Sequence, residues 1–225
     1  MARLAEIRVI LFDLDNTLYP PDAGLIEAGD RLIADFIARR LDLPWGEADE
    51  LRVRLWLQYG ATARGLEVEY GIPQREYFAE SLECVEVSRY INPDPELAAL
   101  LALLPLRRFV FTNSPEVYAA RVLDALGVRG LFEGVFHIES AAGRPKPDAR
   151  PYDVAVRAIG EETRHMALVD DTEANLAPAA ASSSGSGFVP PSASARRKAA
   201  MALALSLIAL AQICTAPIKA IPYSM

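Results

Sequence analysis

Cysteine and histidine are scarce in this chain of 225 residues, which contains only two of each. Cys84 and Cys214 lie far apart in the sequence and lack metal-ligand spacing, so we expect two unpaired thiols in a reducing compartment and no disulfide. His137 and His165 are too few for a histidine-rich zinc site. These shortages argue against a disulfide-rich secreted protein and favour a cytoplasmic one.

Positive charge is also limited, because the formal net charge is −7. No basic surface dominates such a chain, so nucleic acid is not an expected partner. No long apolar stretch follows the N-terminal residues, and we therefore expect no signal peptide. A small anionic ligand, held by a metal or a local lysine, remains compatible with an acidic protein.

Acidic residues are missing altogether from the C-terminal part of the chain. Residues 182–225 contain no Asp or Glu and four basic residues, so residues 1–181 carry the other 19 basic and all 30 acidic residues, a net charge of −11. Residues 182–187, Ser-Ser-Ser-Gly-Ser-Gly, are typical of a flexible linker. We therefore separate an atypical tail, 182–225, from the rest of the chain.

The tail contains 20 uncharged residues, 199–218. Three interpretations compete: a C-terminal membrane anchor, a helix packed against the core, and a segment from a shifted reading frame without selected function. The length suffices for an anchor, but alanines and several polar residues make the segment weakly apolar. We favour the shifted frame, because every acidic residue disappears abruptly.

Short apolar runs at 9–12, 109–111, 135–138 and 166–169 predict four buried strands. Helical segments separate the later strands, one of them beginning with Ser114 as N-cap and Pro115 at the first helical position. This alternation predicts an α/β fold with a doubly wound parallel sheet, a Rossmann-like core.

Residues 21–104 interrupt the alternation, because they show helical periodicity and no strand-like run. Within them, residues 25–41 have an apolar helix face, and further helices are expected from about residues 45, 62, 73 and 95. We interpret the block as an inserted helical cap. The predicted core is then 1–20 and 105–181.

Polar side chains follow all four predicted strands, directly or through a short loop. They are Asp13, Asp15 and Thr17 after the first strand, Thr112 and Asn113 after the second, Lys146 after the third, and Asp170 and Asp171 after the fourth. The carboxyl ends of parallel strands meet at one edge, so a single site is expected there. Neighbouring carboxylates repel unless a cation neutralises one of them or they share a proton, and Mg²⁺ prefers oxygen ligands. Alone, the first motif could be a capped strand end, but four such placements together indicate a site.

These motifs resemble those of the haloacid dehalogenase-like hydrolases over roughly residues 7–180. The resemblance is carried by Phe12-Asp-Leu-Asp-Asn-Thr-Leu-Tyr19, Phe111-Thr-Asn-Ser114, Arg144-Pro-Lys-Pro147, and Val169-Asp-Asp-Thr172 with Asn175-Leu176. The pyrimidine 5'-nucleotidase-like branch is the most similar, on Leu18-Tyr-Pro20, on Tyr59-Gly-Ala-Thr-Ala-Arg-Gly-Leu66 and on the paired aspartates of the last motif. After about residue 181 the sequence departs from the family pattern, where one more helix and strand are expected.

The resemblance implies roles for these residues. Asp13 would attack phosphorus and form an aspartyl-phosphate, and Asp15 would act as general acid and then as general base. The other implied roles are phosphoryl binding by Thr112, Asn113, Thr17 and Lys146, and Mg²⁺ binding by Asp13, Asp171, Asp170 and the backbone carbonyl of Asp15. In the cap, Tyr59 and Arg64 are candidates for substrate contacts. The alternative is that Tyr59 packs in the cap and Arg64 is a solvated charge.

The resulting hypothesis is a Mg²⁺-dependent phosphomonoester hydrolase that acts on a small phosphorylated metabolite. The favoured substrate is a pyrimidine nucleoside 5'-monophosphate. An acid at position 15 favours a phosphatase over a dehalogenase, which needs no proton donor for a halide. The alternatives are a sugar-phosphate or phosphoglycolate phosphatase, and a product impaired by its altered C-terminus. The chain is expected to be a monomer or a homodimer.

Overall fold

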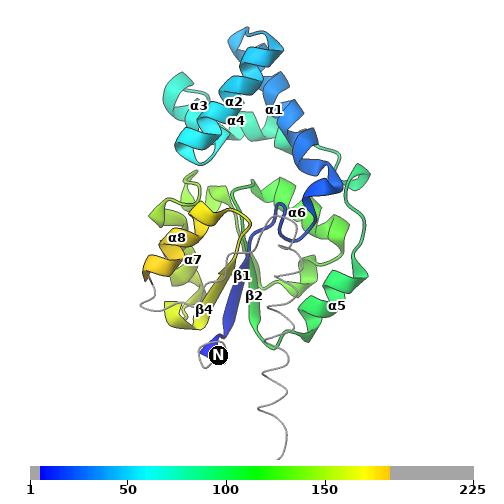
Figure 1. Cartoon of the computed structure of the whole chain (residues 1–225), viewed down its shortest axis with the longest axis vertical. Helices are drawn as coiled ribbons and strands as arrows, with labels where there is room; N and C mark the ends of the chain where they lie inside the picture. The colour runs from blue at the N-terminus through cyan, green and yellow to red at the C-terminus, as the bar shows by residue number, and fades with distance from the viewer. Residues whose placement is uncertain (1–5, 183–225) are drawn as a thin grey trace, which may run out of the picture.

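The computed structural model describes residues 6–182, with side chains as far as residue 177. Their strands form one parallel sheet in the order β3-β2-β1-β4 (Figure 1). The strands are β1, Val9–Phe12; β2, Arg107–Phe111; β3, Gly134–Phe136; and β4, Met166–Val169. In the register of the sheet, Phe12 pairs with Val110 of β2 and Val169 of β4. The predicted α/β fold with a parallel sheet is therefore confirmed.

Eight α-helices occur in the described part of the chain. They are α1, Leu25–Leu41; α2, Trp45–Tyr59; α3, Thr62–Tyr70; α4, Gln74–Glu80; α5, Pro95–Leu103; α6, Glu116–Leu126; α7, Ala149–Ile159; and α8, Glu173–Ser182. The helix predicted over residues 25–41 is confirmed by α1, whose buried positions recur at helical spacing. Strand β3 ends at Phe136, earlier than the predicted end at residue 138. Ile138 instead begins a short 3₁₀ helix, η6, Ile138–Ala141.

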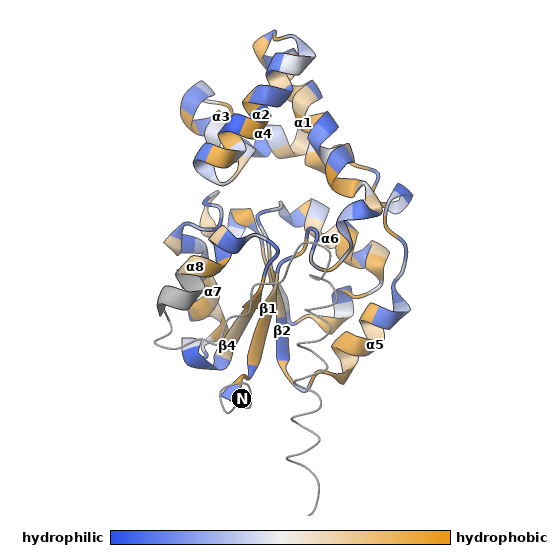
Figure 2. Cartoon of the chain, in the orientation of Figure 1, coloured by the Kyte–Doolittle hydropathy of each residue, from blue (hydrophilic) through white to orange (hydrophobic). Residues whose placement is uncertain are grey.

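Successive side chains of each strand lie on opposite faces of the sheet, as the two-residue period of a strand requires. Ile10 and Phe12 pack in one apolar cluster with α6, whereas Val9 and Leu11 pack in another with α7. Helices α5 and α6 thus lie on one face and α7 and α8 on the other (Figure 1). The strands are mostly apolar, except at the start of β2, where Arg107 and Arg108 stand (Figure 2).

Helices α1 to α4 form a separate helical layer beyond the carboxyl ends of the strands (Figure 1). Their apolar side chains make a second cluster, which includes Phe36, Leu55, Leu66 and Phe78 and is joined by Ile138 of η6. Helices α2 and α3 approach each other closely at Gly65, where an added Cβ would lie 2.7 Å from Cβ of Leu55. This layer corresponds to the cap expected from the sequence.

Helix α5 packs differently from the other helices of residues 21–104. Its Leu97 and Leu101, with the following Leu104, belong to the cluster that covers β1 and β2. A helix so rich in leucine and alanine needs burial, and the face of the sheet provides it. The expected cap boundary at residue 104 is therefore wrong for α5, which packs with the core.

Among residues 6–182, β4 is an edge strand of the sheet. Its four residues are only half-buried. Ser182, the first residue of the predicted linker, is the last residue of α8, and residues 183–187 and the segment 199–218 lie outside the described residues. None of the helices in the described part is long and apolar enough to cross a membrane.

Candidate active site

The first motif forms a tight turn at the end of β1. The N–H of Asp13 continues the β1–β4 ladder by donating to the carbonyl of Val169 at 2.8 Å. The chain then reverses through Asn16, whose φ of 59° is left-handed, a conformation that asparagine tolerates better than most residues. Leu14 and Leu18 are buried on either side of this reversal. The apolar anchors fix the turn that carries Asp13 and Asp15.

Lys146 lies at the centre of the site and is almost fully buried, with 1% of its surface exposed. Its Nζ donates to Oδ1 of Asp13 at 2.9 Å, to Oδ2 of Asp170 at 2.6 Å and to the carbonyl of Phe111 at 2.6 Å. Burial lowers the pKa of Lys146, but the two carboxylates more than offset it, so the pKa is raised. The ammonium therefore stays charged and links three of the four strand ends.

Asn113 determines where Lys146 sits. Its Oδ1 accepts from the Lys146 backbone N–H at 2.7 Å, and its Nδ2 donates to the Lys146 carbonyl at 3.1 Å. The amide was predicted to bind phosphate, yet in the structure it holds the backbone of the loop after β3. This arrangement aligns the motif after β2 with the motif after β3.

A carboxylate cluster surrounds the ammonium. Asp13, Asp170 and Asp171 each offer an oxygen within 4.8 Å of the other two. Oxygen donors of this kind suit a hard divalent cation such as Mg²⁺, and one ammonium cannot balance three carboxylates. Burial raises the pKa of Asp13, Lys146 partly opposes it, and the Asp170 charge raises it further. The donor set therefore fits a metal ion that would favour the ionised Asp13.

Asp170 is oriented by its own loop and by α8. Its Oδ1 accepts from the backbone N–H of Thr172 at 2.9 Å, and Asn175 Nδ2 lies 3.0 and 3.1 Å from its two oxygens. Asn175 is in turn buried at the start of α8. The carboxylate is thus held in one orientation by donors from its own loop and from α8.

The carboxylate of Asp15 is bound elsewhere. Its Oδ1 accepts from the hydroxyls of Tyr19 at 2.5 Å and Tyr118 at 3.1 Å, and its Oδ2 accepts from Ser114 Oγ at 2.5 Å. Ser114 was predicted to cap the following helix. Instead α6 starts at Glu116 after Pro115, and the serine hydroxyl is committed to Asp15.

The two threonines of the prediction lie beside these groups. Thr17 Oγ1 donates to Oδ2 of Asp13 at 3.3 Å. Thr112 is 2% exposed, and its Oγ1 accepts from the backbone N–H of Ser114 at 3.0 Å. Both hydroxyls therefore contribute to the geometry of the site, in addition to any contact with a ligand.

Tyr59 and Arg64 do not join this group in the structure. The Tyr59 hydroxyl donates to Glu69 at 3.0 Å, and the Arg64 guanidinium pairs with Glu67 at 2.5 Å. Both partners belong to α3, so each of the two candidate substrate contacts is paired within the cap. Tyr59 also packs against the apolar cluster of the cap, which was the alternative considered for it.

The cap nevertheless reaches the loop that carries Lys146. Gln74 Nε2 donates to the carbonyl of Gly143 at 3.0 Å. A Cβ added at Gly60 would lie 3.0 Å from the carbonyl oxygen of Lys146. The end of α2 and the start of α4 therefore cover one side of the site.

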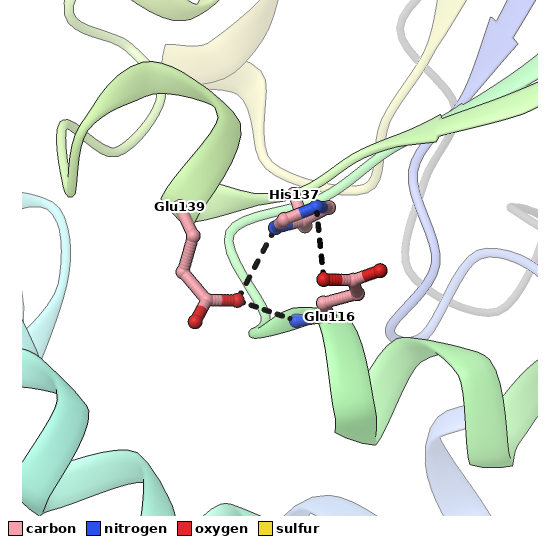
Figure 3. Close-up of side chains that lie close together, drawn as sticks. All are labelled: Glu116, His137 and Glu139. Atoms are coloured by element: carbon pink, nitrogen blue, oxygen red, sulfur yellow. Dashed lines mark hydrogen bonds and ion pairs between the residues drawn. The ribbon is translucent and has the colours of Figure 1, made fainter.

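A second group of ionisable side chains joins η6 to the start of α6. The Glu139 carboxylate accepts from the backbone N–H of Glu116 at 2.8 Å and lies 3.2 Å from Nδ1 of His137 (Figure 3). Glu116 Oε2 is 3.8 Å from the other ring nitrogen. A carboxylate at a helix N-terminus is stabilising. We interpret the group as a structural tie between the loops after β2 and β3.

Sequence reasoning missed the partners of the predicted acids. Tyr118 lies inside α6, 103 residues from Asp15, and no local pattern identifies it. Asn175 was part of the last motif, but its role on Asp170 was not predicted. Lys146, by contrast, was predicted as a site residue, and it is the only lysine before residue 198.

Comparisons with known proteins agree with the geometry. The family model described as haloacid dehalogenase-like hydrolase matches residues 7–183. "Phosphate metabolism protein 8" of Saccharomyces cerevisiae is 26% identical over 75% of this chain, and the match spans 57% of the yeast protein. A phosphoglycolate phosphatase of Rhodospirillum rubrum is 27% identical over 77% of this chain and 76% of its own length. The crystal structure of an HAD phosphatase from Thermococcus onnurineus superposes with a TM-score of 0.56 at 16% identity, covering 86% of this chain and 98% of that one.

Proposed function

Because the chain belongs to the haloacid dehalogenase-like hydrolases, we propose that it is a Mg²⁺-dependent phosphomonoester hydrolase with Asp13 as its nucleophile. The observation that carries this proposal is the buried contact of Lys146 with Asp13 and Asp170. A lysine this deeply buried between two acids offers a fixed positive charge at the nucleophile. The names of the relatives as phosphatases support the same reaction class.

In the first step, an oxygen of Asp13 forms a bond to phosphorus while the ester P–O bond breaks. The electron pair of that bond goes to the leaving oxygen, which takes a proton from Asp15. In the second step, Asp15 accepts a proton from water as the water oxygen attacks phosphorus and releases the Asp13 carboxylate. Lys146, together with Thr112, is assigned to the phosphoryl oxygens.

Asp13, Asp170 and Asp171 are the side chains that would hold Mg²⁺. When bound, the ion would neutralise carboxylate charge and the charge on the phosphoryl group. The backbone carbonyl of Asp15 remains part of the proposal as a further ligand.

Two substrate classes are proposed. The resemblance to the pyrimidine 5'-nucleotidase-like branch points to nucleoside 5'-monophosphates. The phosphoglycolate phosphatase name of the Rhodospirillum rubrum relative favours a small carboxylated phosphomonoester instead. The cap covers the site, so its side chains are expected to decide between the two.

The test is phosphate release by the full-length protein from nucleoside monophosphates, 2-phosphoglycolate and sugar phosphates. The reactions would be run with Mg²⁺ and with chelator. We expect Mg²⁺-dependent release that Asp13→Asn abolishes, while Asp148→Asn, at an exposed pair with Arg144, retains it. No release from a folded wild-type sample would overturn the proposed function.

A further inference from the structure

Asp15 is surrounded by three hydroxyl groups that belong to two different parts of the chain. Tyr19 follows in the first motif, whereas Ser114 and Tyr118 come from the segment after β2 and from α6. Together they engage both oxygens of the carboxylate. Resting on the proposed function, we propose that Tyr19 and Tyr118 are positioning residues that anchor Oδ1 of Asp15, so that Oδ2 is the oxygen that transfers the proton.

The two phenols are rigidly placed. Tyr19 is 1% exposed and Tyr118 is 2% exposed, and both pack in the apolar cluster on the α6 face of the sheet. Their hydroxyl oxygens are 3.4 Å apart and converge on Oδ1. A buried phenol has few other partners, and leaving one unpaired is costly. The packing of the rings therefore fixes the position of Oδ1.

Both phenols are built to remain donors. Burial raises the pKa of Tyr19 well above its ordinary value, and the charge of Asp15 raises it further. The same two causes raise the pKa of Tyr118 well above its ordinary value. Each hydroxyl therefore keeps its proton throughout the pH range in which an enzyme works.

The third hydroxyl is suited to both states of the acid. A neutral carboxyl group has one O–H and still accepts at its other oxygen, and a serine hydroxyl can either donate or accept. Oδ1 can thus accept from both phenols whether or not Oδ2 carries a proton. Ser114 Oγ, 2.5 Å from Oδ2, can keep donating to a lone pair of that oxygen in either state, so a proton on Oδ2 stays available for the leaving oxygen.

The consequence is specific to proton transfer. If Oδ1 were released, the carboxyl could rotate, and the transition state would lose its aligned donor. General acid catalysis contributes on the order of 10²- to 10⁴-fold in rate, and a shift of about 1 Å can cost about 10²-fold. The loss should be large only where the leaving oxygen needs a proton.

The test compares two aryl phosphates that differ in leaving group. Phenoxide is a strong base that benefits from protonation, whereas 2,4-dinitrophenoxide is a weak base that leaves without it. For Tyr19→Phe and Tyr118→Phe, kcat/KM for phenyl phosphate should fall about 10-fold or more. For 2,4-dinitrophenyl phosphate, kcat/KM should change by less than about 3-fold in the same variants. Equal losses on both substrates would overturn the proposal, because a general structural defect lowers both.

Tyr77→Phe is the matched control, since Tyr77 is a buried tyrosine of the cap cluster and is 3% exposed. It should leave the ratio of the two kcat/KM values unchanged. A change in that ratio equal to that of Tyr19→Phe would also contradict the proposal.

A second measurement separates this inference from the proposed function. The decreases in Tm for Tyr19→Phe and Asp15→Asn would be compared with that of the double variant, without any substrate. Groups in direct contact are expected to be non-additive, whereas independent sites add. Additive shifts would overturn the contact between phenol and acid even if the wild type released no phosphate.

Discussion

Replacing Lys146 by methionine removes the ammonium that balances Asp13 and Asp170 inside the core. The ammonium makes three short contacts and is 1% exposed, so the two carboxylates would be left buried without this counter-charge. Breaking a buried ion pair by removing one partner costs about 3–5 kcal/mol. The free energy of unfolding of a domain is about 5–15 kcal/mol, so the loss is a large part of it.

The expected fall in Tm is roughly 6–20 °C, because a domain of this size loses about 2–4 °C for each kcal/mol. The assay is urea and thermal unfolding of the full-length protein at pH 7, with and without Mg²⁺. The loss should shrink when Mg²⁺ is present, since the cation neutralises the same carboxylates.

The control is Arg144→Met, which removes an exposed cation whose Nη1 lies 3.3 Å from Asp148. Exposed pairs contribute about 0–1 kcal/mol, so its Tm should hardly change. If Lys146→Met cost no more than about 1 kcal/mol beyond this control, the assigned ion-pair network would be refuted.

Three further outcomes are expected. Because the pKa of Lys146 is raised in the folded state, its contribution to the free energy of unfolding is complete below the unfolded pKa of about 10.4 and is lost only as pH rises through the folded pKa. The difference in Tm between wild type and Lys146→Met should therefore stay constant from pH 7 to about 10. A smaller difference already at about pH 9 would contradict this. Mg²⁺ should raise the Tm of the wild type more than that of Asp171→Asn, and equal rises would exclude Asp171 as a ligand. Gly65→Ala should lower the free energy of unfolding measured in denaturant by about 1–3 kcal/mol, because its Cβ would lie 2.7 Å from Leu55. Gly46→Ala is the control, since its Cβ would meet no atom within 4 Å and should cost nothing. Equal effects of the two substitutions would count against close packing of α2 and α3.

The positions of the four strands along the chain, and of the principal acids after them, could be predicted from the sequence alone. Apolar runs mark buried strands, and the polar residues that end them must meet at one edge of a parallel sheet. For that reason the sequence pattern is enough to assign a common site to Asp13, Lys146 and Asp170. The regular helix over residues 25–41 was equally predictable, because its apolar spacing repeats over several turns.

Helix α5 shows why the cap boundary was less predictable. Its leucines are distributed around the helix, so the sequence specifies burial but not the surface that provides it. The packing of Leu97 and Leu101 against the sheet depends on the arrangement of the whole chain.

The contacts that each functional side chain makes could be seen only in the fold. Asn113 holds the backbone of Lys146, 33 residues away, and Tyr118 reaches Asp15 across 103 residues. Periodicity and capping patterns report on neighbours within a few residues, whereas these hydrogen bonds follow from which loops the sheet brings together. The chemistry of the site could therefore be predicted from its residue types, but the partner of each polar atom required the fold.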